Sequence, residues 1–188
     1  DVRVPGDFNT QFDELIYYRD TVWYQRQFDL EPLKEGRYHL WFGGANYKTT
    51  IYLNGQAVAH QSGGYVPFSV DVTKHLISKG NDLIVQVNNR LDSDTVPTER
   101  TDWWPYGGLT RDVMLIHTPE AYIVNASVGL DDDRSTISGE VTTTGMEVGD
   151  EIVISLPELD VHTTAETDES GAAKFSFSAN VGLWSPSK

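Results

Sequence analysis

The sequence contains no cysteine among its 188 residues. This absence excludes disulfide bonds and thiolate metal ligands, but it leaves the cellular compartment open because many secreted bacterial proteins also lack cysteine. No apolar run approaches the roughly 20 residues that a membrane helix needs, so we expect no membrane span. Residues 1–6 show no basic segment followed by an apolar stretch, so no signal peptide is visible there.

Positive charge is scarce. The chain has 14 Lys and Arg against 28 Asp and Glu, a net charge of −14, and such a surface repels a phosphate backbone, so nucleic acid is not an expected partner. Residues 1–118 hold 15 acids and 11 bases, whereas residues 119–188 hold 13 acids and three bases. Four of the five tryptophans also lie in the first part. Both shifts predict a domain boundary near Pro119.

The sequence also lacks a helical period, and strand patterns dominate. In residues 38–42, for example, Tyr38, Leu40 and Phe42 alternate with two other side chains. Asn54-Gly55 tolerates the positive φ angles of a tight turn and predicts a hairpin between residues 51–53 and 56–60. Further strands are expected at residues 22–28, 68–72, 83–87 and 113–116, and one short helical turn at 71–76. This many short strands in residues 1–118 predict an antiparallel β-sandwich.

After Pro119 the alternation continues with acidic or glycine-containing turns. We expect five strands, at residues 121–130, 135–143, 151–156, 161–166 and 172–179. An immunoglobulin-like sandwich takes about seven strands in about 100 residues. The second domain is therefore expected to be truncated, or to leave an exposed sheet edge.

The densest group of binding-type side chains follows a long irregular segment at residues 91–98. Asp102 stands there beside Trp103 and Trp104. A carboxylate accepts hydrogen bonds from neighbouring sugar hydroxyls, and an indole covers the apolar face of a pyranose, so this cluster is reasonable sugar-binding chemistry. The competing interpretation is that the two tryptophans fill a core or an interface and that Asp102 caps a turn.

No catalytic pair is expected. Glu99 and Asp102 are three residues apart on a loop, which fixes neither the about 5–5.5 Å nor the about 6.5–9.5 Å separation of glycosidase carboxyl groups. Arg111 follows a glycine pair, and we expect it to pair with Asp112 or to donate to loop carbonyls, with direct substrate contact as the alternative. His60 is expected to be a hydrogen-bonded residue at a strand end.

Other chemistries have no support in the sequence. The five histidines are scattered without the spacing of a zinc site, and no Gly-x-Ser-x-Gly or phosphate-binding glycine loop is present. The run at residues 131–133, three aspartates, lacks the following ligands of a calcium loop and is expected to be a solvated turn. We therefore expect no catalytic residue and no metal ligand in this chain.

Several stretches, taken in order, resemble the N-terminal half of glycoside hydrolase family 2, which includes β-galactosidases, β-glucuronidases and β-mannosidases. They are residues 4–9 (Val-Pro-Gly-Asp-Phe-Asn), 22–28 (Val-Trp-Tyr-Gln-Arg-Gln-Phe), 42–47 (Phe-Gly-Gly-Ala-Asn-Tyr), 51–55 (Ile-Tyr-Leu-Asn-Gly), 60–68 (His-Gln-Ser-Gly-Gly-Tyr-Val-Pro-Phe), 102–113 (Asp-Trp-Trp-Pro-Tyr-Gly-Gly-Leu-Thr-Arg-Asp-Val) and 183–186 (Leu-Trp-Ser-Pro).

The resemblance implies an all-β chain. A jelly-roll, galactose-binding-like sandwich is expected at residues 1–118 and a partial immunoglobulin-like sandwich at residues 119–188. A (β/α)₈ barrel holding both catalytic glutamates would follow in the same polypeptide; such a barrel needs about 250 residues, so this chain alone is expected to be inactive.

The resemblance also implies a role for the loop. In the family the aspartate at the position of Asp102 reaches into the active site and contacts sugar hydroxyls or, in some β-galactosidases, an alkali cation. Trp103 and Arg111 are the neighbouring substrate-binding candidates, and no other cofactor is expected. Residues Pro105 and Thr110 vary among relatives, so the sugar, the linkage, the subfamily and any homo-oligomer stay open.

Three functions therefore compete. The first is a non-catalytic, sugar-facing part of a retaining exo-glycosidase, with a glycoside substrate and the barrel as partners. The second is a stand-alone carbohydrate-binding module. The third is a structural or interaction module in which Trp103 and Trp104 anchor an interface.

Overall fold

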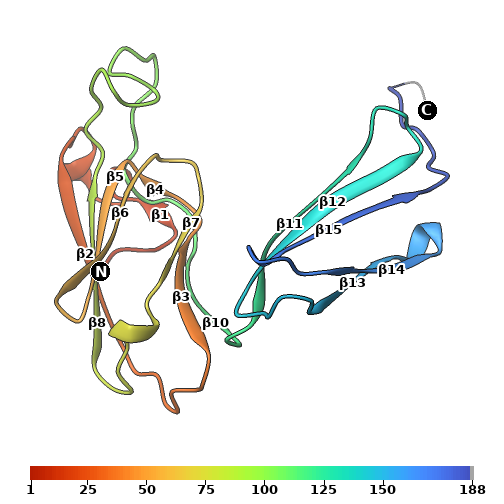
Figure 1. Ribbon diagram of the computed structural model, residues 1–188. Helices are drawn as coiled ribbons and strands as arrows, with labels where there is room; N and C mark the ends of the chain where they lie inside the picture. The colour runs from red at the N-terminus through yellow and green to blue at the C-terminus, as the bar shows by residue number, and fades with distance from the viewer. Residues whose placement is uncertain (187–188) are drawn as a thin grey trace. The chain divides into compact units, whose positions relative to one another are not determined.

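The computed structural model describes residues 1–186, which are almost entirely antiparallel β-structure (Figure 1). Helical structure in this range is limited to three short 3₁₀ turns, η1 (Asp13–Leu15), η2 (Thr73–His75) and η3 (Pro157–Leu159). The chain divides into two compact units, the first from Asp1 to His117 and the second from Thr118 onward. The predicted all-β, sandwich-type fold class is confirmed.

Two larger sheets and one small sheet build the first unit. The four-stranded sheet has the order β2 (Thr21–Phe28), β8 (Asn81–Asn88), β5 (Lys48–Leu53), β6 (Gln56–Ser62). The second larger sheet has the order β10 (Val113–Thr118), β3 (Arg37–Phe42), β7 (Phe68–Asp71). The small sheet has the order β1 (Gly6–Asp7), β9 (Gly108–Leu109), β4 (Ala45–Asn46). The small sheet was not expected, because two-residue strands leave no alternation to read.

The core of this unit follows from the alternation, because successive side chains of a strand point to opposite faces. The inward-facing side chains of β3, β5 and β8 are buried in one continuous cluster. Its members from these strands are Tyr38, Leu40, Phe42, Ile51, Leu53, Leu83, Val85 and Val87. The predicted strands of residues 1–118 are confirmed.

The Asn54-Gly55 turn closes the hairpin of β5 and β6 as predicted. Both residues have positive φ angles, 52° and 80°. Asn54 is also tied to the neighbouring turn, because its Nδ2 donates to the carbonyl of His75 at 2.7 Å. The expected helical turn at residues 71–76 is η2, whereas η1 and η3 were not expected.

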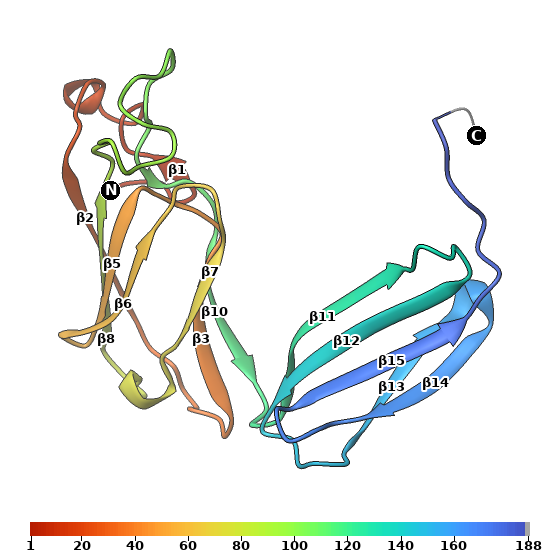
Figure 2. The same cartoon turned by 45° about the horizontal axis from the view of Figure 1, so that its top comes forward.

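The second unit packs two sheets around a smaller core (Figure 2). One sheet has the order β11 (Tyr122–Leu130), β12 (Thr136–Thr144), β15 (Ala172–Ser178), and the other pairs β13 (Glu151–Leu156) with β14 (Val161–Glu166). All five predicted strands are therefore present. Strand β11 lies at a sheet edge and is exposed over nearly its whole length.

Buried asparagines fix the end of the loop at residues 90–106, and one of them, Asn89, directly precedes its start. Asn89, directly after β8, donates through Nδ2 to the carbonyl of Pro105 at 3.0 Å. Asn9 accepts through Oδ1 from the backbone N–H of Gly107 at 2.8 Å, and Asn46 donates to the carbonyl of Tyr106 at 2.5 Å. All three side chains lie in the buried interior, where an unpaired backbone group would be costly, so these bonds determine where the loop leaves and rejoins the sandwich.

Gly107 allows this close packing. A β-carbon at that position would stand 2.4 Å from Cβ of Asn89 and 2.6 Å from Cζ of Phe8, neither of which has room to move. The end of the loop thus depends on a residue without a side chain, because only glycine lets the backbone approach the buried amides so closely.

We predict that Asn89→Ala destabilises the first unit by about 1–3 kcal/mol, because it leaves the buried carbonyl of Pro105 without its donor. The free energy of unfolding from urea titration measures the change. Asn125→Ala, at an exposed strand position of the second unit, is the matched control and should change it little. Equal effects of the two substitutions would show that the buried amide does not anchor the loop.

A second prediction concerns acid stability of the turn before β12. Hydrogen bonds from the Thr136 hydroxyl and the Ser135 and Thr136 N–H groups lower the pKa of Asp133 from 3.8 to about 2. A lowered folded-state pKa stabilises the protein above pH 3.8, and this contribution is lost as the pH falls toward about 2.

Asp133→Asn should therefore lower the melting temperature at neutral pH more than near pH 2. Asp132→Asn, in the same turn, is the control and should change the melting temperature at neutral pH little, because the hydrogen bonds of the turn are made by Asp133. Carboxyl NMR shifts give the titration directly, and a midpoint of Asp133 near 3.8 would contradict the assignment.

Candidate functional site

The loop at residues 90–106 rises from one end of the first unit (Figure 1). Trp104 attaches it to the segment that precedes β2. The guanidinium Cζ of Arg19 lies 4.2 Å from the ring centroid of Trp104, and the ring of Tyr17 meets it edge-on at 5.5 Å. Trp104 is only partly exposed, and its buried Nε1 has no partner among residues 1–186. Trp104 therefore packs within its own domain, which agrees with the structural interpretation of the tryptophan pair and not with sugar contact.

Asp102 is exposed, and its carboxylate makes no hydrogen bond or ion pair with any residue the structure describes. The local bond comes from Thr101, whose Oγ1 donates to the carbonyl of Trp103 at 3.1 Å. The alternative that Asp102 caps a turn is therefore not what the structure shows. Both carboxylate oxygens are available to accept hydrogen bonds from another molecule or domain.

Trp103 presents its indole to the outside. Its side chain is 56% exposed, and exposed apolar side chains continue on the same loop and on the adjoining segment, at Tyr106 (47%), Val96 (77%) and Tyr17 (76%). Trp103 thus exposes apolar surface on this loop, unlike Trp104. Exposed patches of this kind mark contact sites for ligands or for other domains.

Arg111 lies beyond β9, beside the glycine pair at residues 43–44. Its backbone N–H donates to the carbonyl of Gly44 at 3.4 Å, and its Cβ would be 2.9 Å from a β-carbon on Gly43. The guanidinium forms no ion pair with Asp112 and no hydrogen bond to a loop carbonyl within residues 1–186. The ion pair with Asp112 is therefore not formed, whereas the expected hydrogen bond from Arg111 to a loop carbonyl is present through its backbone N–H. The structure also shows no hydrogen bond or ion pair between Arg111 and Asp102.

The remaining candidates have local structural contacts. His60, on β6, is hydrogen-bonded through Nδ1 to the hydroxyl of Thr50 at 3.1 Å. The aspartates at residues 131–133 form a turn held by the Asp133 carboxylate. No group of three potential metal-ligating side chains occurs in the part of the chain that the structure describes.

Sequence reasoning missed the residues that hold the loop. Asn9, Asn46 and Asn89 were not singled out, although Asn9 and Asn46 stand inside two of the quoted motifs. The available signal was an asparagine in a short glycine-containing motif, as for Asn9 and Asn46, or directly after a buried strand, as for Asn89. At such places a hydrogen-bonding side chain can satisfy irregular backbone.

Tyr24 is a further buried polar group at the base of the loop. Its hydroxyl would be 2.8 Å from a β-carbon on Gly108, and burial raises its pKa to about 12. The phenol therefore stays neutral at physiological pH and adds no charge beneath the loop.

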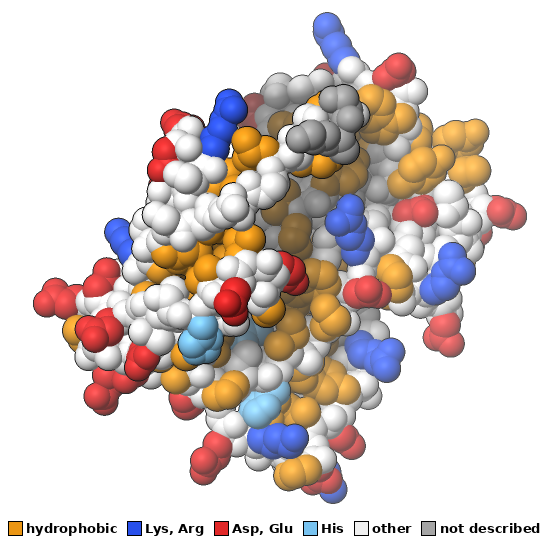
Figure 3. Space-filling model, turned by 90° about the vertical axis from the view of Figure 1, so that its right-hand side faces the viewer, with side chains coloured by type: hydrophobic (Ala, Val, Ile, Leu, Met, Phe, Trp, Pro, Cys, Tyr) orange, Lys and Arg blue, Asp and Glu red, His pale blue; other side chains and the backbone are white. Residues whose placement is uncertain are grey.

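Acidic side chains are spread over the face drawn in Figure 3, among patches of apolar side chains. No helix within residues 1–186 has the length and apolar character to cross a membrane.

Comparison with known proteins gives consistent matches. Residues 1–119 match the family described as glycosyl hydrolases family 2, sugar binding domain. The chain is 28% identical to the β-glucuronidase of Canis lupus familiaris over 219 aligned positions, covering 99% of this chain and 33% of that protein. It is 33% identical to the β-galactosidase of Thermoanaerobacter pseudethanolicus over 141 positions, covering 70% of this chain and 19% of the relative.

A solved structure agrees. The β-glucuronidase of Bifidobacterium dentium, complexed with coumarin-3-O-glucuronide, superposes with a TM-score of 0.85 at 28% identity, over 97% of this chain and 37% of that one. The chain thus spans about a third, or less, of the length of these relatives. The family match over more than half of the chain, and the relatives that share it, show that the chain belongs to glycosyl hydrolase family 2.

Proposed function

We propose that this chain is the non-catalytic, sugar-facing and scaffold part of a retaining exo-glycosidase. Residues 1–118 form its jelly-roll sugar-binding domain and residues 119–188 a partial immunoglobulin-like domain. The loop at residues 90–106 completes an active site whose catalytic carboxylates belong to a (β/α)₈ barrel of the same polypeptide.

One observation carries the proposal: Asp102 is a solvent-facing carboxylate without a partner among the described residues, on a loop whose end at residues 105–107 is fixed by buried amides. An exposed loop aspartate with no partner adds nothing to the stability of its own domain. Its position is explained if its hydrogen-bond partners are supplied by a bound sugar.

The chemistry of the loop fits a saccharide. The Asp102 carboxylate can accept two hydrogen bonds from adjacent hydroxyls, and the exposed face of Trp103 can pack against the apolar face of the ring. The guanidinium of Arg111, between β9 and β10, has no partner among residues 1–186 and is a further donor. The resemblance also implies, for some β-galactosidases, an alkali cation against this aspartate, and a lone carboxylate could supply one ligand to such a cation.

The proposal also limits what the chain does alone. A single loop provides one side of a pocket, so methyl glycosides should bind it too weakly to saturate in an NMR titration, and the chain should not hydrolyse them. Tight, saturable binding at Asp102 would instead favour the stand-alone carbohydrate-binding module.

In the whole glycosidase polypeptide, Asp102→Ala should lower kcat/KM by about 100-fold or more, as expected when a buried hydrogen bond to substrate is lost from the transition state. The melting temperature should stay unchanged, because the side chain has no partner within the domain. Asp94→Ala, another exposed aspartate on the same loop, is the matched control and should keep wild-type kinetics. Wild-type kinetics of Asp102→Ala itself would end the proposal.

Trp103→Ala separates sugar contact from interface anchoring. We expect it to raise KM in the whole enzyme while the melting temperature changes little, because the indole is already 56% exposed within this chain. Steady-state kinetics and thermal unfolding give the two readouts. A large loss of stability with unchanged kinetics would assign Trp103 to a structural interface instead.

A further inference from the structure

The outward face of the four-stranded sheet carries a straight row of side chains that can bind a ligand. The strand register places Trp23 opposite Gln86, Gln86 opposite Thr50, and Thr50 opposite His60. Directly opposite residues share a sheet face and have β-carbons about 4.5–5.5 Å apart. The row therefore crosses all four strands, β2, β8, β5 and β6.

A hollow of about 450 Å³ lies over this row. Such a volume falls within the range of about 300–1,000 Å³ typical of small-molecule sites. Its lining is rich in hydroxyl, amide and imidazole groups and includes Thr21, Thr50, His60, Gln86 and Asn88. Nε2 of His60 and the amide of Gln86 have no partner among residues 1–186, so they remain available to a ligand.

An aromatic pair borders the hollow. Trp23 is 58% exposed, and its ring centroid lies 6.0 Å from that of Tyr52 with the planes inclined by 32°. Trp23 is two positions from Thr21 on β2, and Tyr52 is two positions from Thr50 on β5. Both threonines line the hollow, so both rings face the same side of the sheet. Apolar rings beside a polar groove match the two kinds of surface that a pyranose presents.

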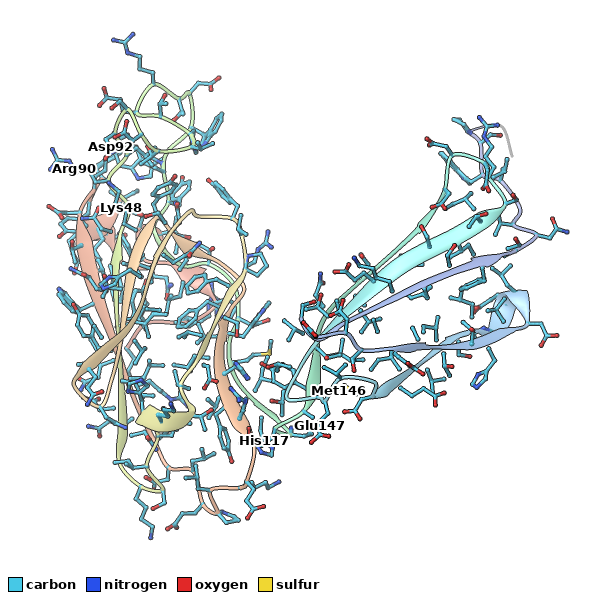
Figure 4. The ribbon with its side chains drawn as sticks, viewed as in Figure 1. Lys48, Arg90, Asp92, His117, Met146 and Glu147 are labelled. Atoms are coloured by element: carbon cyan, nitrogen blue, oxygen red, sulfur yellow. The ribbon has the colours of Figure 1, made fainter. Side chains whose placement is uncertain are left out.

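Charged groups of both signs lie in and beside the hollow. Lys48 and Asp92 form an ion pair at 2.9 Å, and Figure 4 shows them with Arg90 at the same end of the sheet. The second acid is Asp20, which accepts from Nδ2 of Asn88 at 3.0 Å. Asp94 also acts electrostatically on Lys48, so two cations face three anions, on a chain whose net charge is −14. This excess of acids disfavours a polyanion and favours an uncharged ligand.

The geometry points to a second saccharide-binding surface on this sheet face, for a neutral oligosaccharide. Its rings would pack on Trp23 and Tyr52, and its hydroxyls would bond Gln86, Thr50 and His60 along the row. The surface is separate from Asp102 and needs no residue of that loop, so it holds whether or not the proposed active-site role is correct. A solvated sheet face explains the polar groups, but it does not explain an exposed indole paired with Tyr52 at the border of the hollow.

The test is an NMR titration of the 188-residue chain with cellohexaose, mannohexaose and, as the anionic probe, hexagalacturonate. We expect at least one neutral hexasaccharide to shift amides of β2, β5 and β8 saturably. Trp23→Ala should raise the dissociation constant for that hexasaccharide about tenfold, because one good stacking contact is lost. Thr50→Val should raise it less. The amide spectra of both variants without ligand should otherwise be unchanged.

Two controls keep the result specific. Trp184→Ala removes a tryptophan that is 81% exposed in the second unit, and Asp102→Ala removes the loop carboxylate; both should leave the dissociation constant unchanged. The inference is overturned if no neutral hexasaccharide shifts these strands, if only hexagalacturonate does, or if the shifts centre on residues 99–106 and disappear in Asp102→Ala.

Discussion

Buried amide hydrogen bonds are the constraint on which the loop depends. A segment of this length, with no regular structure of its own, loses much conformational entropy when it is ordered. Asn9, Asn46 and Asn89 offset that cost by satisfying backbone groups at residues 105–107, where the loop rejoins the sandwich and would otherwise bury them unpaired. Glycine at position 107 gives the backbone room to reach them. The sandwich is in this sense a rigid base for one exposed carboxylate.

The arrangement separates stability from binding. The core lies between the sheets of the first unit, whereas Asp102 and Trp103 are exposed at its end. Trp104, on the same loop, contributes to stability, because its contacts with Arg19 and Tyr17 attach the loop to the segment before β2. Substitutions at the tip can therefore alter a ligand contact without unfolding the domain.

Period-2 alternation was sufficient to predict the long strands and the Asn54-Gly55 hairpin, because side-chain direction and turn geometry are local properties. The two-residue strands β1, β4 and β9 escaped prediction, since they depend on long-range pairing. Arg111 shows the same limit. Its sequence neighbour Asp112 suggested an ion pair, but the two side chains do not form one in the folded chain. The jelly-roll and immunoglobulin-like assignments, like the role of Asp102, rest on the resemblance and stay predictions.

The most direct measurement is a crystal structure of the whole glycosidase with a bound product sugar. We predict a carboxylate oxygen of Asp102 at about 2.6–3.2 Å from a sugar hydroxyl, with the carbonyls of Pro105 and Tyr106 still bonded to Asn89 and Asn46. A product sugar enclosed by the barrel alone, with Asp102 turned to bulk solvent, would contradict it.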